Sequence, residues 1–221
     1  MRLLIISLAL ACAVAHADGQ LRGASEVPAR LGPDARAAIQ RLIDSARVAG
    51  LPTAPLADKA AEGVLKGADD RRVLSAVQTL LHQLIDARDI LGRTDDVSLL
   101  GATASALQAG VPVAELRRLA AASRGSMSAA DSRALAGALV TLVDLVAKRV
   151  PPAAASASIE ELLRRHATEE QFVVLRGEVE RDILGGQSPE AALAARTRAQ
   201  VKALDALSPS DRTLPRRPPP G

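Results

Sequence analysis

The most constraining feature of this chain is an apolar stretch in its middle, ADSRALAGALVTLVDLVAKRV, which covers residues 130–150. Its apolar residues recur at helical spacing and also fill the other sides, which predicts a helix buried on most sides. Asp144 interrupts the run, and the run is shorter than the ~20 apolar residues that a bilayer crossing needs. We therefore expect a central helix at about residues 129–149. Its apolar positions are Leu135, Leu139, Val140, Leu142, Val143, Leu145 and Val146.

The rest of the chain predicts further helices and no strands. No segment shows sustained two-residue alternation with β-branched residues, as a half-buried strand would. Several helix starts are marked by a Ser or Thr followed three residues later by an acid or an amide, which can form a capping box. The expected fold is all-α, an irregular multi-helix bundle. The three capping pairs are Ser128 with Asp131, Ser158 with Glu161, and Thr168 with Gln171.

A recurring corner separates these helices. A Gly or a basic residue closes one helix, an apolar residue follows, and a Pro allows only a new helix start. The spacings between the corners are unequal, which predicts degenerate helical hairpins rather than a strict solenoid. The corners are Gly50-Leu51-Pro52, Gly110-Val111-Pro112, Arg149-Val150-Pro151 and, more loosely, Gly186-Gln187-Ser188-Pro189.

Composition along the chain suggests a division into parts. Stretches rich in Pro, Gly, Ser and charge without a helical period are typical of arms, linkers and tails. The expected parts are a leader at 1–17, a mobile arm at 18–31, a main helical domain at 32–150, a Pro/Ala/Ser linker at 151–157, a three-helix part at 158–207 within the same domain or separate from it, and a Pro/Arg tail at 208–221.

The first 17 residues read as an export signal. Arg2 supplies the positive start, Leu3 to Val14 form the apolar segment, and Ala15 and Ala17 give the small-x-small pattern that signal peptidase cuts, leaving Asp18 first. The protein is therefore expected to be periplasmic or secreted, with no transmembrane segment in the mature chain.

Cys12 is the only cysteine, and the leader carries it. Lipidation at Cys12 is the alternative to soluble export, although the residues before it match a lipoprotein signal only at Ala11. Removal of the leader leaves no thiol for a disulfide or a metal site. The chain has 28 Lys and Arg against 25 Asp and Glu. Such a small excess does not indicate a nucleic-acid binder.

The second predicted helix carries a more specific pattern. Gly50-Leu51-Pro52 is followed by Leu56, Lys59, Glu62-Gly63 and Lys66-Gly67. This segment resembles a family of uncharacterised exported bacterial helical proteins, over Gly50 to Leu91 and more loosely over most of the mature chain. The resemblance implies export and a helical fold, and it implies no activity.

Acidic pairs and histidines are the first candidates for chemistry. Each acidic pair falls in the first turn of a predicted helix, where negative charge is stabilised by the helix dipole, and neighbours on a helix do not face each other. Capping therefore explains them better than catalysis. His82 lies on a polar helix side, and His166 lies near a helix end, where it could interact with the last carbonyls. No HExxH motif or other ligand spacing supports a metal. The acidic pairs are Asp69-Asp70, Asp95-Asp96, Glu160-Glu161 and Glu169-Glu170.

Five residues are candidates for contact with a ligand or partner: Lys59, Glu62, Lys66, Asp144 and His166. Lys59, Glu62 and Lys66 have the spacing of a surface ion-pair ladder, with an anion or ligand contact as the alternative. Asp144 is unusual because it interrupts an apolar helix, where an unpaired carboxylate would be costly. We expect it to reach the surface and pair with Lys148, and the alternative is a buried contact with an Arg or a partner.

These features predict an exported, non-enzymatic helical protein that acts by protein–protein contact in the cell envelope. The partner is expected to be an unknown envelope protein, with the basic tail reaching anionic envelope surfaces. One alternative is a binding protein for a small or lipidic ligand beside the central helix. A hydrolase with a site assembled from distant residues is the weaker alternative, because no nucleophile motif or phosphate loop occurs. No cofactor, catalytic residue or metal ligand is assigned.

Overall fold

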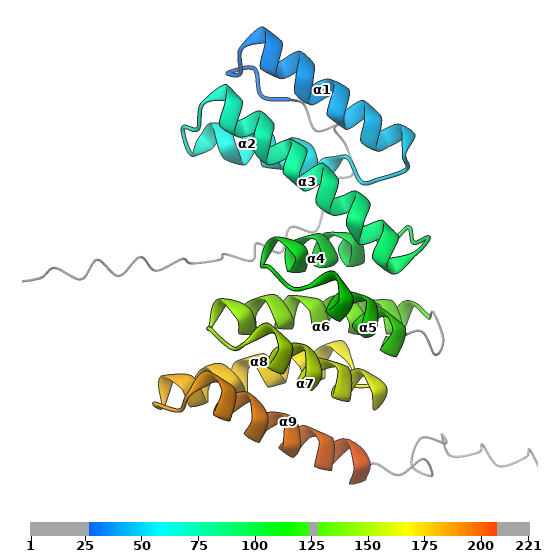
Figure 1. Cartoon of the computed structure of the whole chain (residues 1–221), viewed down its shortest axis with the longest axis vertical. Coiled ribbons are helices and arrows are strands. Elements are labelled where there is room, and N and C mark those ends of the chain that lie inside the picture. The colour runs from blue at the N-terminus through cyan, green and yellow to red at the C-terminus, as the bar shows by residue number, and fades with distance from the viewer. Residues whose placement is uncertain (1–26, 124–127, 207–221) are drawn as a thin grey trace, which may run out of the picture.

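The computed structural model describes residues 27–123 and 128–206, and these residues form helices and no strand (Figure 1). The all-α, multi-helix prediction is confirmed. The predicted leader with its cleavage residues, most of the arm at 18–31 and the tail at 208–221 lie outside the described residues. The helices are α1 Pro33–Val48, α2 Ala54–Leu65, α3 Asp70–Leu91, α4 Val97–Gln108, α5 Val113–Ser123, α6 Ala129–Ala147, α7 Pro152–Arg164, α8 Glu169–Leu184 and α9 Pro189–Ala206.

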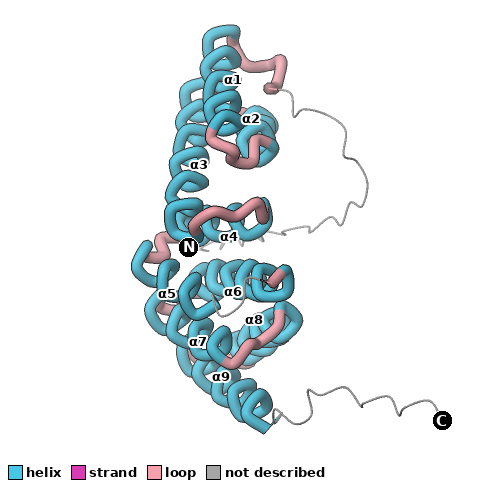
Figure 2. The backbone as a smooth tube through the Cα atoms, turned by 90° about the vertical axis from the view of Figure 1, so that its right-hand side faces the viewer, coloured by secondary structure: helices cyan, strands magenta, loops and turns pink. Residues whose placement is uncertain are grey.

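The helices stack in two layers. Each odd-numbered helix, from α1 to α9, packs against the next odd-numbered one, and α4, α6 and α8 pack in sequence as the second layer. Figure 2 shows the stack edge-on as a bowed column, with α2, α4, α6 and α8 along its inner side. Such a column, in which each helix contacts mainly its neighbours, has the architecture of an α-solenoid.

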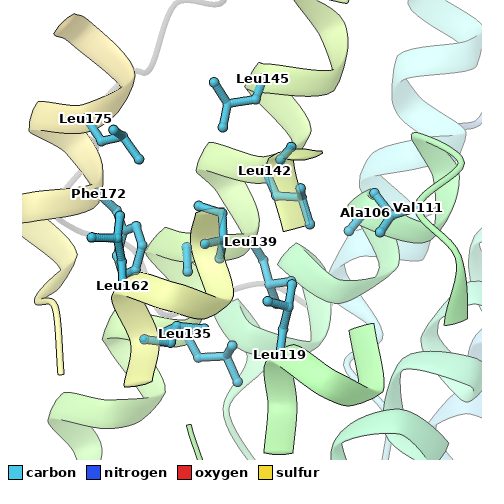
Figure 3. Close-up of a cluster of buried hydrophobic side chains, with 14 of the residues drawn as sticks. Ala106, Val111, Leu119, Leu135, Leu139, Leu142, Leu145, Leu162, Phe172 and Leu175 are labelled. Atoms are coloured by element: carbon cyan, nitrogen blue, oxygen red, sulfur yellow. The ribbon is translucent and has the colours of Figure 1, made fainter. Parts of the chain in front are cut away.

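Two hydrophobic cores meet at α4. One core lies among α1 to α4, and the larger one runs from the end of α3 to α9. α4 contributes Leu100 to the first and Leu99 to the second, so it is buried on two sides. α6 packs against α4, α5, α7 and α8 and supplies Leu135, Leu139, Leu142 and Leu145 to the larger core (Figure 3). The expected central helix is thus present, but Val140 on its outer side is exposed.

Six helix ends in the described part share one hydrogen-bonded corner. A residue with positive φ follows each helix, and the N–H of the next residue donates to the carbonyl five residues back at 2.8–3.1 Å. This is the Schellman motif. The next helix begins two or three residues after the residue that donates this hydrogen bond, so the connections are very short. The positive-φ residues are Gly50, Gly67, Gly110, Arg149, His166 and Gly186.

The corners that lead from the second layer back to the first are regularly spaced. They contain Gly67, Gly110, Arg149 and Gly186, about 40 residues apart, as expected for a stack of helix pairs. The corners recognised in the sequence are unequally spaced because they include Gly50. Gly50 leads in the opposite direction, from α1 to α2, and does not belong to this series.

Two predicted boundaries are wrong. The segment 151–157, expected to be a linker, lies almost entirely within α7, whose first residue is Pro152. Ser158 therefore lies inside the helix rather than capping it, and the last three helices share the larger core with α4 to α6. Leu31, placed in the mobile arm, is buried in the first core.

Arg149 and His166 adopt a left-handed backbone, with φ of 67° and 58°, where glycine is preferred. Because a side chain is strained there, Arg149→Gly should raise the free energy of unfolding by about 0.5 kcal/mol. Ala147→Gly, within the last turn of α6, should lower it by about 0.5–1 kcal/mol. Urea denaturation followed by circular dichroism measures both changes, and two changes of the same sign would contradict the corner described here.

Candidate binding surface

Helices α6 and α8 lie side by side in parallel. Asp144 of α6 accepts a hydrogen bond from Arg176 of α8 at 2.8 Å, and one turn further on Lys148 pairs with Glu180 at 3.4 Å. The hydroxyl of Thr141 donates to the carbonyl of Phe172 at 3.3 Å in the same register. These contacts fix which side of each helix faces outward.

Asp144 therefore has a different partner from the expected one. It pairs with Arg176, which lies 32 residues away, whereas Lys148 pairs with Glu180. Both side chains of the Asp144–Arg176 pair are 36% exposed, so the carboxylate is neither free nor deeply buried. The pair neutralises the charge that interrupts the apolar outer side of α6.

The second layer has a side that faces away from the first layer, on the inner side of the bowed column, and this side is here called the α4–α6–α8 face. It is largely uncharged at its centre. α4 contains no charged residue. Val140 of α6 is 44% exposed, and Val173 and Val174 of α8 are 50% and 52% exposed. The face consists of the outward residues Val97, Ser98, Gly101 and Ser105 of α4, Val140 and Ala147 of α6, and Val173, Val174 and Gly177 of α8.

Four glycines lie in helix interiors, where glycine costs about 0.5–1 kcal/mol relative to alanine. A Cβ on Gly63 would approach Val73 Cγ2 to 2.9 Å, and one on Gly137 would approach Glu169 Cγ to 2.9 Å, so packing explains these two. A Cβ on Gly101 or Gly177 would meet nothing within 4 Å. Contacts within the described chain thus do not account for Gly101 and Gly177, and both lie on the α4–α6–α8 face.

The predicted ladder on α2 is present but lies outside this face. Lys59 Nζ is 2.9 Å from Glu62 Oε2, and Lys66 pairs with the other oxygen of Glu62. The hydrogen bonds from Lys66 and then Lys59 lower the pKa of Glu62. Gly67 follows the end of α2 and has a positive φ. All three charges are satisfied by one another, as in an ordinary surface ladder.

His166 lines a cavity of about 200 Å³ where the ends of α5 and α7 meet the starts of α6 and α8. Asp131, Arg133, Glu169 and Glu170 also line it. The Ser128 hydroxyl and N–H hold the pKa of Asp131 below its ordinary value. Asp144 does not line this cavity.

Three of the acidic pairs lie at helix starts, as expected, but Glu160 and Glu161 lie in the second half of α7 and pair with Arg164 and Arg165. Asp69 accepts from the N–H of Arg72, and Asp96 accepts from the N–H of Leu99, as N-caps. The Thr168 hydroxyl lowers the pKa of Glu170. The capping boxes expected at Ser128 and Thr168 are both confirmed.

Sequence reasoning missed the two unsupported glycines and one strong ion pair. Gly101 and Gly177 were detectable as glycines inside predicted helices, but their exposure depends on how the helices stack. The ion pair joins Asp182 of α8 to Arg196 of α9 through two hydrogen bonds of 2.6 and 2.7 Å. Arg196 holds the pKa of Asp182 below its ordinary value.

Within residues 27–123 and 128–206, no three His, Cys, Asp or Glu side chains gather in a way that could hold a metal ion. None of the described helices is long and apolar enough to cross a membrane. Comparison with protein-family models, curated proteins and solved structures gives no match for this chain.

Proposed function

We propose that this protein is a non-enzymatic binding protein and that its α4–α6–α8 face contacts a partner protein. The observation that carries the proposal is the pair of interior glycines, Gly101 and Gly177, with open space in front of them. Glycine inside a helix lowers stability, and natural proteins accept such losses mainly where function requires them. A partner that packs closely against the two helices would explain why glycine is present at both positions.

The chemistry of the face defines the partner segment. Exposed Val140, Val173 and Val174 offer apolar contacts at its centre, and the Asp144–Arg176 pair is already neutralised. The partner is therefore a protein segment with an apolar, uncharged contact surface, because placing a lone charge against such a face would be unfavourable. Export, and with it a partner in the cell envelope, stays a prediction.

The cavity beside His166 gives less support to the alternative of a lipidic ligand. Charged side chains line it, and lipid chains bind in apolar cavities. The small- or lipidic-ligand function and the hydrolase function remain alternatives without an observation that favours them.

Site-specific photocrosslinking in the producing cells tests the proposal. A photoreactive amino acid at Val140 or Val173 should give a crosslinked product of one defined mass with each position. Val113 of α5 is a matched control, because it is a valine of similar exposure, 39%, in the other layer. Equal crosslinking at Val113 and Val140, or none at Val140 and Val173, would refute the proposed face.

Replacing either glycine with alanine should raise the stability of the protein and weaken its contact with the partner. Gly101→Ala and Gly177→Ala should each raise the free energy of unfolding by about 0.5–1 kcal/mol, since helix propensity improves and no clash results. The same substitutions should reduce the crosslinking yield at Val140. Gly63→Ala is the control, because its Cβ would meet Val73 and the variant should be less stable. Stabilised variants with unchanged crosslinking would show that no partner needs the glycines.

A further inference from the structure

The α4–α6–α8 face repeats one outward position in each of its three helices. Each of these helices is followed by a corner residue with positive φ, and the residue nine positions before that corner lies on the face. Because α6 packs between α4 and α8, the three residues form a row in the order glycine, valine, glycine, which is symmetric about its middle. The row is Gly101, Val140 and Gly177, nine residues before Gly110, Arg149 and Gly186.

The three helices run in the same direction. α6 and α8 are parallel, as their ion pairs show, and the starts of α4 and α6 line one small cavity, to which Leu99 and Leu135 contribute. A two-fold axis through Val140 would therefore set the helices of a second copy antiparallel to these. Such an axis places α6 against itself and α4 of one copy against α8 of the other. Gly101 then faces Gly177 of the other copy, so that both glycines lie where two helices approach most closely.

The two edges of the face are complementary in size. α8 carries Val173 one turn before Gly177, and its side chain is 50% exposed. α4 carries the smaller Ser105, also exposed, one turn after Gly101. In antiparallel helices the residue before one glycine lies opposite the residue after the other glycine. Val173 therefore meets Ser105 of the other copy, and the symmetry forms this contact twice.

The charges at the rim are complementary as well. Arg181, one turn after the glycine of α8, is exposed and lies opposite the start of α4 of the other copy, where Asp95 is exposed. α4 contains no charged residue, so α8 meets no like charge along it. On α6, Arg133 and Ala147 lie seven residues on either side of the axis and therefore face each other. Like charges thus do not meet where the two copies pack.

We propose that a second copy of this chain occupies the α4–α6–α8 face, related to the first by a two-fold axis at Val140. The inference rests on the proposed function, because it names the partner of the same face. A second copy has the chemistry required of that partner, since its own face is apolar and uncharged at the centre. It also gives both glycines one role, because each receives the helix that carries the other.

Disulfide formation in the purified protein tests the pairing, with Cys12 replaced by Ser. Val140→Cys should give a disulfide-linked dimer on mild oxidation, because the axis places this residue beside its own copy. Ser105→Cys and Val173→Cys should each give no linked dimer alone but should give one when the two variants are mixed. Val113→Cys, in the other layer, is the control and should give none. A linked dimer from Ser105→Cys alone, or none from Val140→Cys, would refute the axis.

Reversing the charges at the rim tests the register independently of cysteine chemistry. Arg181→Glu should raise the dissociation constant of the dimer about 10-fold, because two ion pairs are lost and the new carboxylate faces Asp95. Adding Asp95→Arg to the same chain should restore the association. Lys202→Glu, on the exposed side of α9, should leave it unchanged. Analytical ultracentrifugation measures these constants, and failure of the second substitution to restore association would contradict the register.

The mass of the photocrosslinked product separates this inference from the proposed function. A photoreactive amino acid at Val140 in the producing cells should give a product of twice the mass of the chain that contains this chain alone. A single product of another mass would keep the α4–α6–α8 face as a binding surface and would overturn the second copy as its occupant. No crosslinking at Val140 and Val173 would refute both proposals.

Discussion

Phe172→Ala should lower the free energy of unfolding by about 3–5 kcal/mol, as expected for truncating a fully buried aromatic residue. Phe172 is 0% exposed and is the one aromatic residue of the chain. It lies on α8 against α6 and α7, where the core otherwise consists of Leu, Val, Ile and Ala side chains (Figure 3). Small side chains on fixed helices cannot close a gap of this size. Urea denaturation followed by circular dichroism measures the loss.

The adjacent residue provides the control. Val173 is 50% exposed on the same helix turn, so Val173→Ala should change the free energy of unfolding by less than about 0.5 kcal/mol. Equal destabilisation by the two substitutions would mean that α8 does not pack in the orientation described.

Asp182→Ala should lower the melting temperature by about 5 °C, because it leaves Arg196 without its main partner between α8 and α9. The Asp182 side chain is only 9% exposed, and Arg196 binds both of its oxygens. Glu178 lies 3.8 Å from Arg196 and can replace only part of this contact. Glu180→Ala, which removes an exposed acid from the same helix, is the control and should have a small effect. Thermal melts that show equal losses would contradict the assignment.

The same ion pair predicts a direction of pH dependence. Arg196 lowers the folded-state pKa of Asp182 below the unfolded value of ~3.9. Its stabilisation is therefore fully present above pH ~4 and is lost as the pH falls through the lowered pKa. The difference in melting temperature between the wild type and Asp182→Asn should be constant from about pH 5 to 8 and should shrink below pH ~4. A difference that grows on acidification would exclude this account.

The helix ends were predictable because their signals are local. Ser128 with Asp131, Thr168 with Gln171 and the caps at Asp69 and Asp96 act within one turn, so the sequence shows both members of each contact. The start of α7 was missed because its first turns, PAAASAS, have no amphipathic period, although Pro is a favoured first residue of a helix.

The candidate surface was not predictable because it depends on stacking. Asp144 has Lys148 as a plausible partner one turn away, and only the parallel packing of α6 and α8 brings Arg176 closer. The same packing decides that Gly137 is covered by Glu169 while Gly177 is open. Hydrophobic periodicity identifies a buried side for each helix, but it does not identify which helix covers it.

The column of helices also makes position in the sequence a measure of position along the molecule. α1 packs against α2 and α3, and α9 packs against α7 and α8, so the two ends of the described chain do not share a neighbour. Adding or deleting one helix pair would therefore change the length of the protein while leaving the remaining contacts in place. In evolutionary terms, duplication of a unit of about 40 residues would lengthen the column by one helix pair.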